Sequence, residues 1–158
     1  HSLQKIAECY FLKGKKKLAI DYLQKALSIR KVNLGVEHPL VVACLTTIGN
    51  FHATMANNEL AISFHKDALE ILQKKLGRRH PDIAKCLNNL GACYAGLEDY
   101  ESAIAYFQKA LIAVTPSFDS KNIYSNPDLK AYSNGYALLD TFNRKAKILM
   151  HFFILKNK

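Results

Sequence analysis

The sequence contains no hydrophobic run long enough to cross a membrane. Its longest apolar run, residues 148–155, is interrupted by His151 and falls far short of the roughly 20 residues that a membrane-spanning helix needs. The N-terminal residues also lack the charged, apolar and small-residue regions of a secretory signal peptide. We therefore expect no membrane partner and a cytoplasmic location.

Metal-binding and catalytic motifs are absent as well. The 4 cysteines form no C-x-x-C pair and have no histidine at zinc-ligand spacing, and free thiols are typical of a reducing compartment. The sequence also has no Gly-rich phosphate loop, no H-E-x-x-H motif and no nucleophile elbow. It therefore predicts no catalytic residues, no metal, no cofactor and no enzyme activity.

What the sequence does contain is a repeat of 42 residues. Counting back 42 positions from Gly91 reaches Gly49, and another 42 reaches Ala7. Other small and apolar positions align in the same way: Leu87 with Leu45 and Leu3, Tyr94 with His52 and Tyr10, Ala103 with Ala61 and Ala19, and Ala110 with Ala68 and Ala26. A period in this range indicates an array of stacked helical units.

The best-formed copy of the repeat predicts two helices joined by a short turn. Apolar residues at spacings of three and four predict a first helix over residues 81–96 and a second over 99–114. Proline at the start of each first helix, as at Pro39 and Pro81, suits a position that needs no N–H donor. Small residues such as Gly91 allow the two helices to approach closely, so each copy is expected to be an antiparallel helix pair.

Repeat positions also account for the cysteines and for four of the histidines. The cysteines occupy two positions on one face of the first helix, where we expect buried apolar thiols: Cys9 and Cys93, Cys44 and Cys86. The histidines are expected at helix entries or in the core: His38 and His80 at entries, His52 and His65 in the core.

The order Leu87, Leu90, Gly91, Tyr94, Ala103, Phe107, Ala110 resembles the signature of the tetratricopeptide repeat family. The period of 42 and the Leu-Gly-x-x-His-Pro links at 34–39 and 76–81 are similar to those of kinesin light chains. Residues 108–132 resemble the repeat arrays that precede caspase-like CHAT domains in bacterial proteins. The resemblance implies an all-α, right-handed superhelical solenoid of antiparallel helix pairs, with three repeats and the first helix of a fourth.

The repeats are expected at residues 1–34, 35–77 and 78–116, followed by an insertion loop at 117–133 and an incomplete fourth repeat at 134–158. Because this pattern opens and closes inside repeats, we expect the chain to be part of a longer protein. A helical stripe predicts the first helix of the fourth repeat: Leu138, Leu139, Phe142, Ala146 and Leu149, with Ala146 in the place of Gly91. A turn is expected near 128–133. Without a partner helix, an apolar face is expected to cause self-association: Ile148, Leu149, Phe152, Phe153 and Leu155.

By similarity with the tetratricopeptide family, a partner-binding groove is expected along the first helices. The candidate residues are Gln4, Lys5, Glu8 and Phe11, then Ala43, Thr46, Thr47 and Asn50, then Lys85, Asn88, Asn89 and Ala92. The fourth repeat would add Asp140, Asn143, Arg144 and Lys147. Asn amides both donate and accept hydrogen bonds, which suits binding of an extended peptide backbone. The family's chaperone carboxylate clamp is not reproduced, because only Lys85 fits it.

The leading functional hypothesis is a protein-interaction scaffold, the adaptor or regulatory segment of a larger CHAT-type protein. The formal net charge of +9 favours an acidic protein or extended peptide as partner. One alternative is a nucleic-acid-binding helical solenoid, although the basic residues are dispersed over turns. Another is a cargo adaptor like the kinesin light chain, which the repeat length favours.

Overall fold

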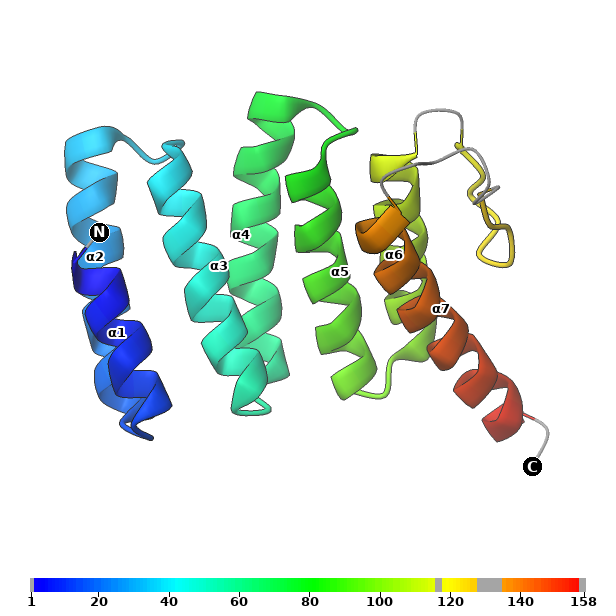
Figure 1. Cartoon of the computed structure of the whole chain (residues 1–158), viewed down its shortest axis with the longest axis horizontal. Helices are drawn as coiled ribbons and strands as arrows, with labels where there is room; N and C mark the ends of the chain where they lie inside the picture. The colour runs from blue at the N-terminus through cyan, green and yellow to red at the C-terminus, as the bar shows by residue number, and fades with distance from the viewer. Residues whose placement is uncertain (1, 116–117, 128–134, 157–158) are drawn as a thin grey trace. The chain divides into compact units, whose positions relative to one another are not determined.

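The computed structural model describes residues 2–115, 118–127 and 135–156 of the 158-residue chain (Figure 1). Within these ranges the chain forms seven α-helices and no strand, which confirms the all-α class. The helices are α1 (Ser2–Leu12), α2 (Lys16–Leu34), α3 (Pro39–Thr54), α4 (Asn58–Leu76), α5 (Pro81–Gly96), α6 (Tyr100–Val114) and α7 (Gly135–Lys156). The helices form two compact units, unit 1 over His1–Ile71 and unit 2 over Leu72–Lys158.

In unit 1, consecutive helices pack as antiparallel pairs. Tyr10 of α1 stacks on Tyr22 of α2, with ring centroids 5.4 Å apart. Between α3 and α4, a Cβ atom added to Gly49 would lie 2.7 Å from Cε1 of His65, so the missing side chain is what lets the imidazole approach. His65 is fully buried and His52 nearly so, as expected from their repeat positions.

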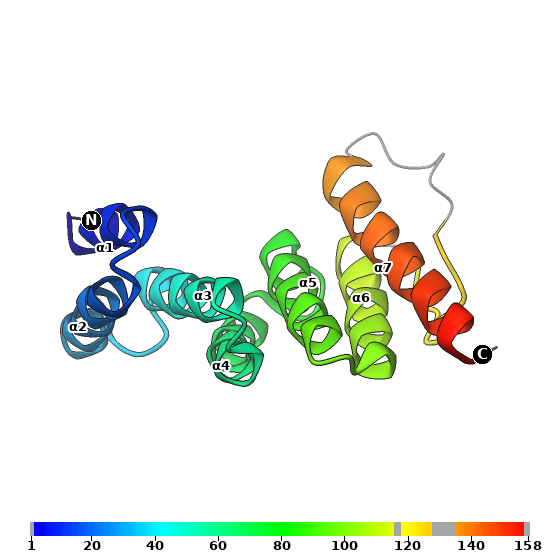
Figure 2. The same cartoon turned by 90° about the horizontal axis from the view of Figure 1, so that it is seen from below.

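Unit 2 repeats this packing between α5 and α6. A Cβ atom added to Gly91 would lie 2.8 Å from Cε1 of Phe107, and Tyr94 stacks on Tyr106 with centroids 5.1 Å apart. These contacts lie 42 residues after their counterparts in α3 and α4, or 84 after those in α1 and α2. α7 packs along α6 (Figures 1 and 2).

The helix ends form as the sequence predicts. The Nδ1 atoms of His38 and His80 accept hydrogen bonds from the backbone N–H groups of Leu40 and Asp82, both at 3.1 Å, so these two histidines cap α3 and α5. Each is followed by the expected proline at the first helical position. Capping satisfies one of the N–H groups that have no partner inside the helix.

Two sequence expectations need correction. Cys9 is exposed, because no described helix packs on its face of α1, whereas the other three cysteines are buried. The buried face of α7 contains Thr141 and Lys145 rather than the predicted stripe, of which Leu139 and Ala146 are exposed and Phe142 and Leu149 are only half-buried.

The reason for the α7 difference is that α7 contacts α6 through one face only. In the earlier repeats, the Gly49 and Gly91 positions pack on the following helix, and no described helix follows α7 to cover Ala146. The side chain of Leu138 and the turn expected near 128–133 lie outside the described residues.

A cluster of basic residues lies at the end of α4 and just after it. Lys74 and Lys75 do lie in the last turn of α4, where cations meet the partial negative charge of the helix end. Arg79, however, reaches the end of α6: it donates to the backbone oxygens of Ile112 at 3.1 Å and Thr115 at 2.6 Å. Its charge therefore meets the C-terminal end of α6 rather than that of α4.

Candidate partner-binding surface

In unit 1, the structure brings together two of the expected groove residues from different helices. The amide nitrogen of Gln4 on α1 donates to the hydroxyl oxygen of Thr47 on α3 at 3.2 Å. Thr47 in turn donates to the backbone oxygen of Ala43, one turn earlier, at 2.8 Å. Gln4 and Thr47 are half-buried. Their hydrogen bond therefore holds α1 against α3, and both side chains remain partly exposed on the surface of unit 1.

Arg30, which the sequence analysis missed, contacts this pair through Gln4. It lies on α2, is only 8% exposed, and donates to the Gln4 amide oxygen at 3.2 Å and to the Leu40 backbone oxygen at 3.0 Å. Its position follows the buried residues Ala26 and Leu27 at helical spacing. That spacing, which places a charged residue on the inner face of α2, was the signal that could have revealed it.

The same guanidinium also donates to the sulfur of Cys44 at 2.8 Å. Burial raises the pKa of the Cys44 thiol above its usual value, although the neighbouring Arg30 charge acts in the opposite direction. Burial likewise raises the pKa of Cys86 to about 12 and that of Cys93 to about 11. These three thiols are therefore protonated near neutral pH and are poor nucleophiles or metal ligands.

Phe11 stacks face to face on Phe51 of α3, with ring centroids 3.8 Å apart and an interplanar angle of 16°. This ring is therefore part of the α1–α3 packing. Lys5, Glu8 and Asn50 are exposed, and Ala43 and Thr46 are half-buried. Lys5 also lines a hollow of about 340 Å³ on α1, together with Ile6, Cys9, Tyr10 and Lys13, but no other candidate groove residue borders it.

In unit 2, the amide nitrogen of Asn88 on α5 donates to the hydroxyl oxygen of Thr141 on α7 at 2.6 Å. The Asn88 amide oxygen is buried and has no hydrogen-bond partner among the residues that the structure describes. The sequence analysis named Asn143 as a groove residue of this helix and did not single out Thr141.

The remaining candidates of unit 2 lie near the surface. Lys85 is exposed and approaches the carboxylate of Asp82, one turn earlier, at 3.4 Å. Asn89 is half-buried and Ala92 is exposed. α5 therefore presents a cation, the Asn89 amide and a small residue at spacings of four and three.

The α7 candidates lie on exposed surface. Arg144 pairs with Asp140 across one helical turn at 2.9 Å, and Asn143 and Lys147 are exposed. Such exposed pairs contribute little to stability. The structure therefore does not bring these side chains to Asn88, and their place in a groove stays a prediction.

Neither a metal centre nor a membrane span is found in the described part of the chain. No group of three or more His, Cys, Asp or Glu side chains there is arranged to hold a metal ion. None of the described helices is both long enough and apolar enough to cross a membrane.

Comparison with known proteins identifies the repeat. The profile of the family described as Tetratricopeptide repeat matches residues 1–74 and 41–111. No curated protein matches the sequence. The solved structure of BtubC (BKLC) from P. vanneervenii is similar over 98% of this chain, with a TM-score of 0.68 and 19% sequence identity. This chain spans 62% of the length of BtubC, which is less than two thirds.

Two further similar structures come from Podosopora anserina and are described as the nearly identical TPR-like repeats of a kinesin light chain. Each alignment covers 94% of this chain and 72% of the chain in the similar structure, at 15% sequence identity. The TM-scores are 0.64 and 0.63. At this level of identity the likeness establishes the helical-repeat fold and nothing finer. Together with the profile match, which covers well over half of the residues, it shows that the chain belongs to the tetratricopeptide repeat family, a family of protein-interaction scaffolds.

Proposed function

We propose that this protein is an interaction scaffold that binds an acidic, extended protein segment along its first helices. The observation that carries the proposal is the composition of the α5 surface, where Lys85, Asn89 and Ala92 follow one another at helical spacing. A lysine supplies attraction for carboxylates, the Asn89 amide suits a peptide backbone, and the small side chain of Ala92 leaves room for it.

The charge of the chain supports an acidic partner. The formal net charge is +9, and the only anion that the described contacts give Lys85 is the exposed Asp82. Because that contact is long and solvated, a partner carboxylate could replace it at small cost. Positive charge of this size also speeds the diffusional encounter with an acidic segment.

The proposal includes a larger context. We propose that the chain is the adaptor or regulatory segment of a CHAT-type protein in the cytoplasm, and the alternative is a cargo adaptor of the kinesin-light-chain type. The three buried free thiols suit a reducing compartment. We also propose that the exposed apolar residues of α7, which are Met150, Phe153, Ile154 and Leu155, allow the protein to self-associate.

A nucleic-acid-binding function is less well supported. Binding of single strands relies on aromatic rings that are free to stack on bases. Tyr10 and Tyr22 stack on each other within one helix pair, and Tyr94 and Tyr106 do so within another. These four rings are therefore committed to internal packing.

A capture experiment with matched charge reversals tests the proposal. The immobilised protein is incubated with a native lysate, with and without nuclease, and the retained molecules are identified by mass spectrometry. We expect an acidic protein that survives nuclease, is lost with Lys85→Glu, and is retained with Lys109→Glu, since Lys109 is exposed on α6 rather than on a first helix.

Two results would count against the proposal. Recovery of nucleic acid alone would favour the nucleic-acid alternative, and binding there should weaken steeply with salt. Equal loss with both charge reversals would show that net charge rather than the α5 surface governs capture. Asn88 is left unchanged in this test because its contact with Thr141 also joins α5 to α7.

A further inference from the structure

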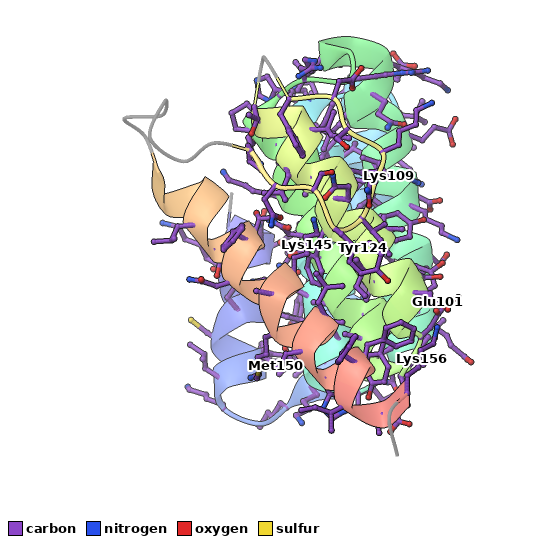
Figure 3. The ribbon with its side chains drawn as sticks, turned by 90° about the vertical axis from the view of Figure 1, so that its right-hand side faces the viewer. Glu101, Lys109, Tyr124, Lys145, Met150 and Lys156 are labelled. Atoms are coloured by element: carbon purple, nitrogen blue, oxygen red, sulfur yellow. The ribbon has the colours of Figure 1, made fainter. Side chains whose placement is uncertain are left out.

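The strongest departure from the repeat pattern is a buried lysine on α7. Lys145 is 1% exposed, although the residues at the corresponding positions of the earlier repeats, Leu90 and Ile48, are apolar. Its ammonium donates to the side-chain oxygen of Gln108 at 2.5 Å, to the backbone oxygen of Ser125 at 2.8 Å and to the side-chain oxygen of Asn126 at 3.1 Å (Figure 3). Three acceptors match the three N–H donors of an ammonium group.

A second exception to the repeat lies next to it. Gln108 on α6 is 2% exposed, whereas its counterparts Lys66 and Gln24 in the earlier repeats are exposed. While its amide oxygen accepts from Lys145, its amide nitrogen donates to the backbone oxygen of Ser120 at 2.6 Å. Both exceptions therefore serve the same segment, which follows α6 and has no counterpart in the other repeats.

That segment, residues 118–127, is here called the strap. Its backbone is folded on itself: the N–H of Tyr124 donates to the Asn122 side-chain oxygen at 2.9 Å, and the N–H of Ser125 donates to the Asn122 backbone oxygen at 3.0 Å. The start of the strap is held separately, because Arg79 donates to the Phe118 backbone oxygen at 3.3 Å and lies 3.4 Å from the Asp119 carboxylate.

We propose that the strap can open and close. In the closed state, the ammonium of Lys145 holds the distal half of the strap, residues 122–127, against α6 and α7. Without that ammonium the proximal half stays attached through Arg79 and Gln108, while the distal half opens. Opening would free the side-chain oxygen of Gln108 and uncover the region beside it on α6, while the Gln108 amide nitrogen keeps its bond to Ser120. It would also change how the exposed Tyr124 is presented.

The charge state suits this role. Burial lowers the pKa of Lys145 to about 8, so the side chain still carries its proton at neutral pH and all three N–H groups donate. Bonds from an ionised donor are roughly twice as strong as those between neutral groups. Two of the three acceptors belong to the strap, so the strap receives most of this interaction.

Hydrogen exchange of the Lys145→Leu variant tests the proposal. Leucine is the residue of the Leu90 position, so α7 should keep its packing on α6. We expect the amides of Tyr124 and Ser125 to exchange at least about ten-fold faster, the effect of losing one charge-assisted hydrogen bond. Protection in α6 and the helical content should stay unchanged, and Lys109→Leu, which alters an exposed lysine of α6, should leave strap exchange as it was.

The proposal is overturned if the strap amides keep their protection in Lys145→Leu, or if strap and α7 lose protection together and to the same extent. The latter result would show that Lys145 holds the helix rather than the strap. Should Lys145→Leu fail to fold, Asn126→Ala removes one strap acceptor and leaves both helices intact. That variant is also expected to speed exchange at Tyr124 and Ser125, and unchanged exchange would again overturn the proposal.

Discussion

At the scale of single residues, one repeat position is filled differently in each copy. His65 packs against Gly49 in the second copy and Phe107 against Gly91 in the third, and Leu23 holds the corresponding position of the first copy. All three are buried, and the histidine is the one that can take up a proton. Burial lowers the pKa of His65 to about 4, so folding of unit 1 favours the neutral imidazole.

This shift predicts acid-sensitive stability in unit 1. The unfolded chain takes up the proton near pH 6.5, whereas the folded chain does so only near pH 4, so stability is fully present above pH 6.5 and is lost as the pH falls toward 4. The loss should be on the order of 3 kcal/mol. Chemical denaturation across this pH range measures it.

The matched control for this prediction is His65→Phe, which reproduces the Gly91–Phe107 contact in unit 1. The difference in unfolding free energy between the variant and the original chain gives the contribution of the His65 imidazole alone. The contribution of carboxylates that titrate in the same pH range cancels, because both chains contain them. A difference that does not change with pH would contradict the assignment of acid sensitivity to His65.

At the scale of helices, the close contact between paired helices depends on a matched small and large residue. The third copy pairs Gly91 with Phe107, and the corresponding positions of the first copy hold Ala7 and Leu23, both fully buried. An added Cβ at Gly91 would lie 2.8 Å from the Phe107 ring, so alanine there forces the ring or the helix to move. A smaller partner side chain should relieve this clash.

A double-mutant cycle tests this pairing. Gly91→Ala should destabilise unit 2 by about 1–3 kcal/mol, the usual cost of overpacking, less up to about 1 kcal/mol gained from higher helix propensity. Adding Phe107→Leu gives unit 2 the residues of the first copy, Ala7 and Leu23. The loss of unfolding free energy in the double variant should therefore be about 1 kcal/mol smaller than the sum of the losses in the two single variants. Additive losses in thermal unfolding would contradict the predicted contact.

The helices themselves were largely predictable from the sequence. The expected first helix of the third copy has the observed bounds of α5, and the second differs from α6 by one residue at its start. Apolar spacing and the His-Pro entries determine these elements locally. The contacts of the candidate groove were less predictable, because Arg30, Thr141 and Lys145 act through partners on other helices or in the strap, which spacing along one helix does not reveal.

The buried face of α7 shows the limit most clearly. The sequence analysis aligned Ala146 with Gly91 and assumed a buried apolar stripe. The buried side chains are Thr141 and Lys145, since a lysine whose donors are all satisfied can replace an apolar residue in the interior. Hydrophobic periodicity alone therefore could not predict which side of α7 faces α6.

At the scale of the whole molecule, the chain carries a large apolar surface on α7. Met150 and Phe153 are 65% and 70% exposed, and Ile154 and Leu155 are about half exposed. Side chains of this kind, gathered on one helix, favour contact with another apolar surface. In the family fold each helix is covered by its neighbours on both sides. No described helix follows α7, and these side chains are therefore left uncovered.

We expect the protein to self-associate through this face. Sedimentation velocity at high micromolar concentration should give a mass above that of the monomer, and Phe153→Glu should return the monomer mass by placing a charge in the contact. Lys147→Glu, an exposed change on the same helix, should have little effect. A strictly monomeric original chain would rule this association out.

The most direct test of the central claim, that a partner protein lies along the first helices, is site-specific photo-crosslinking. A photoreactive residue is placed at Ala92 on α5 or at Lys109 on α6, both exposed, and each variant is irradiated with the captured partner. The account predicts a crosslinked partner from position 92 and little or none from position 109. Crosslinking from position 109 alone would contradict it and would move the binding surface to the second helices.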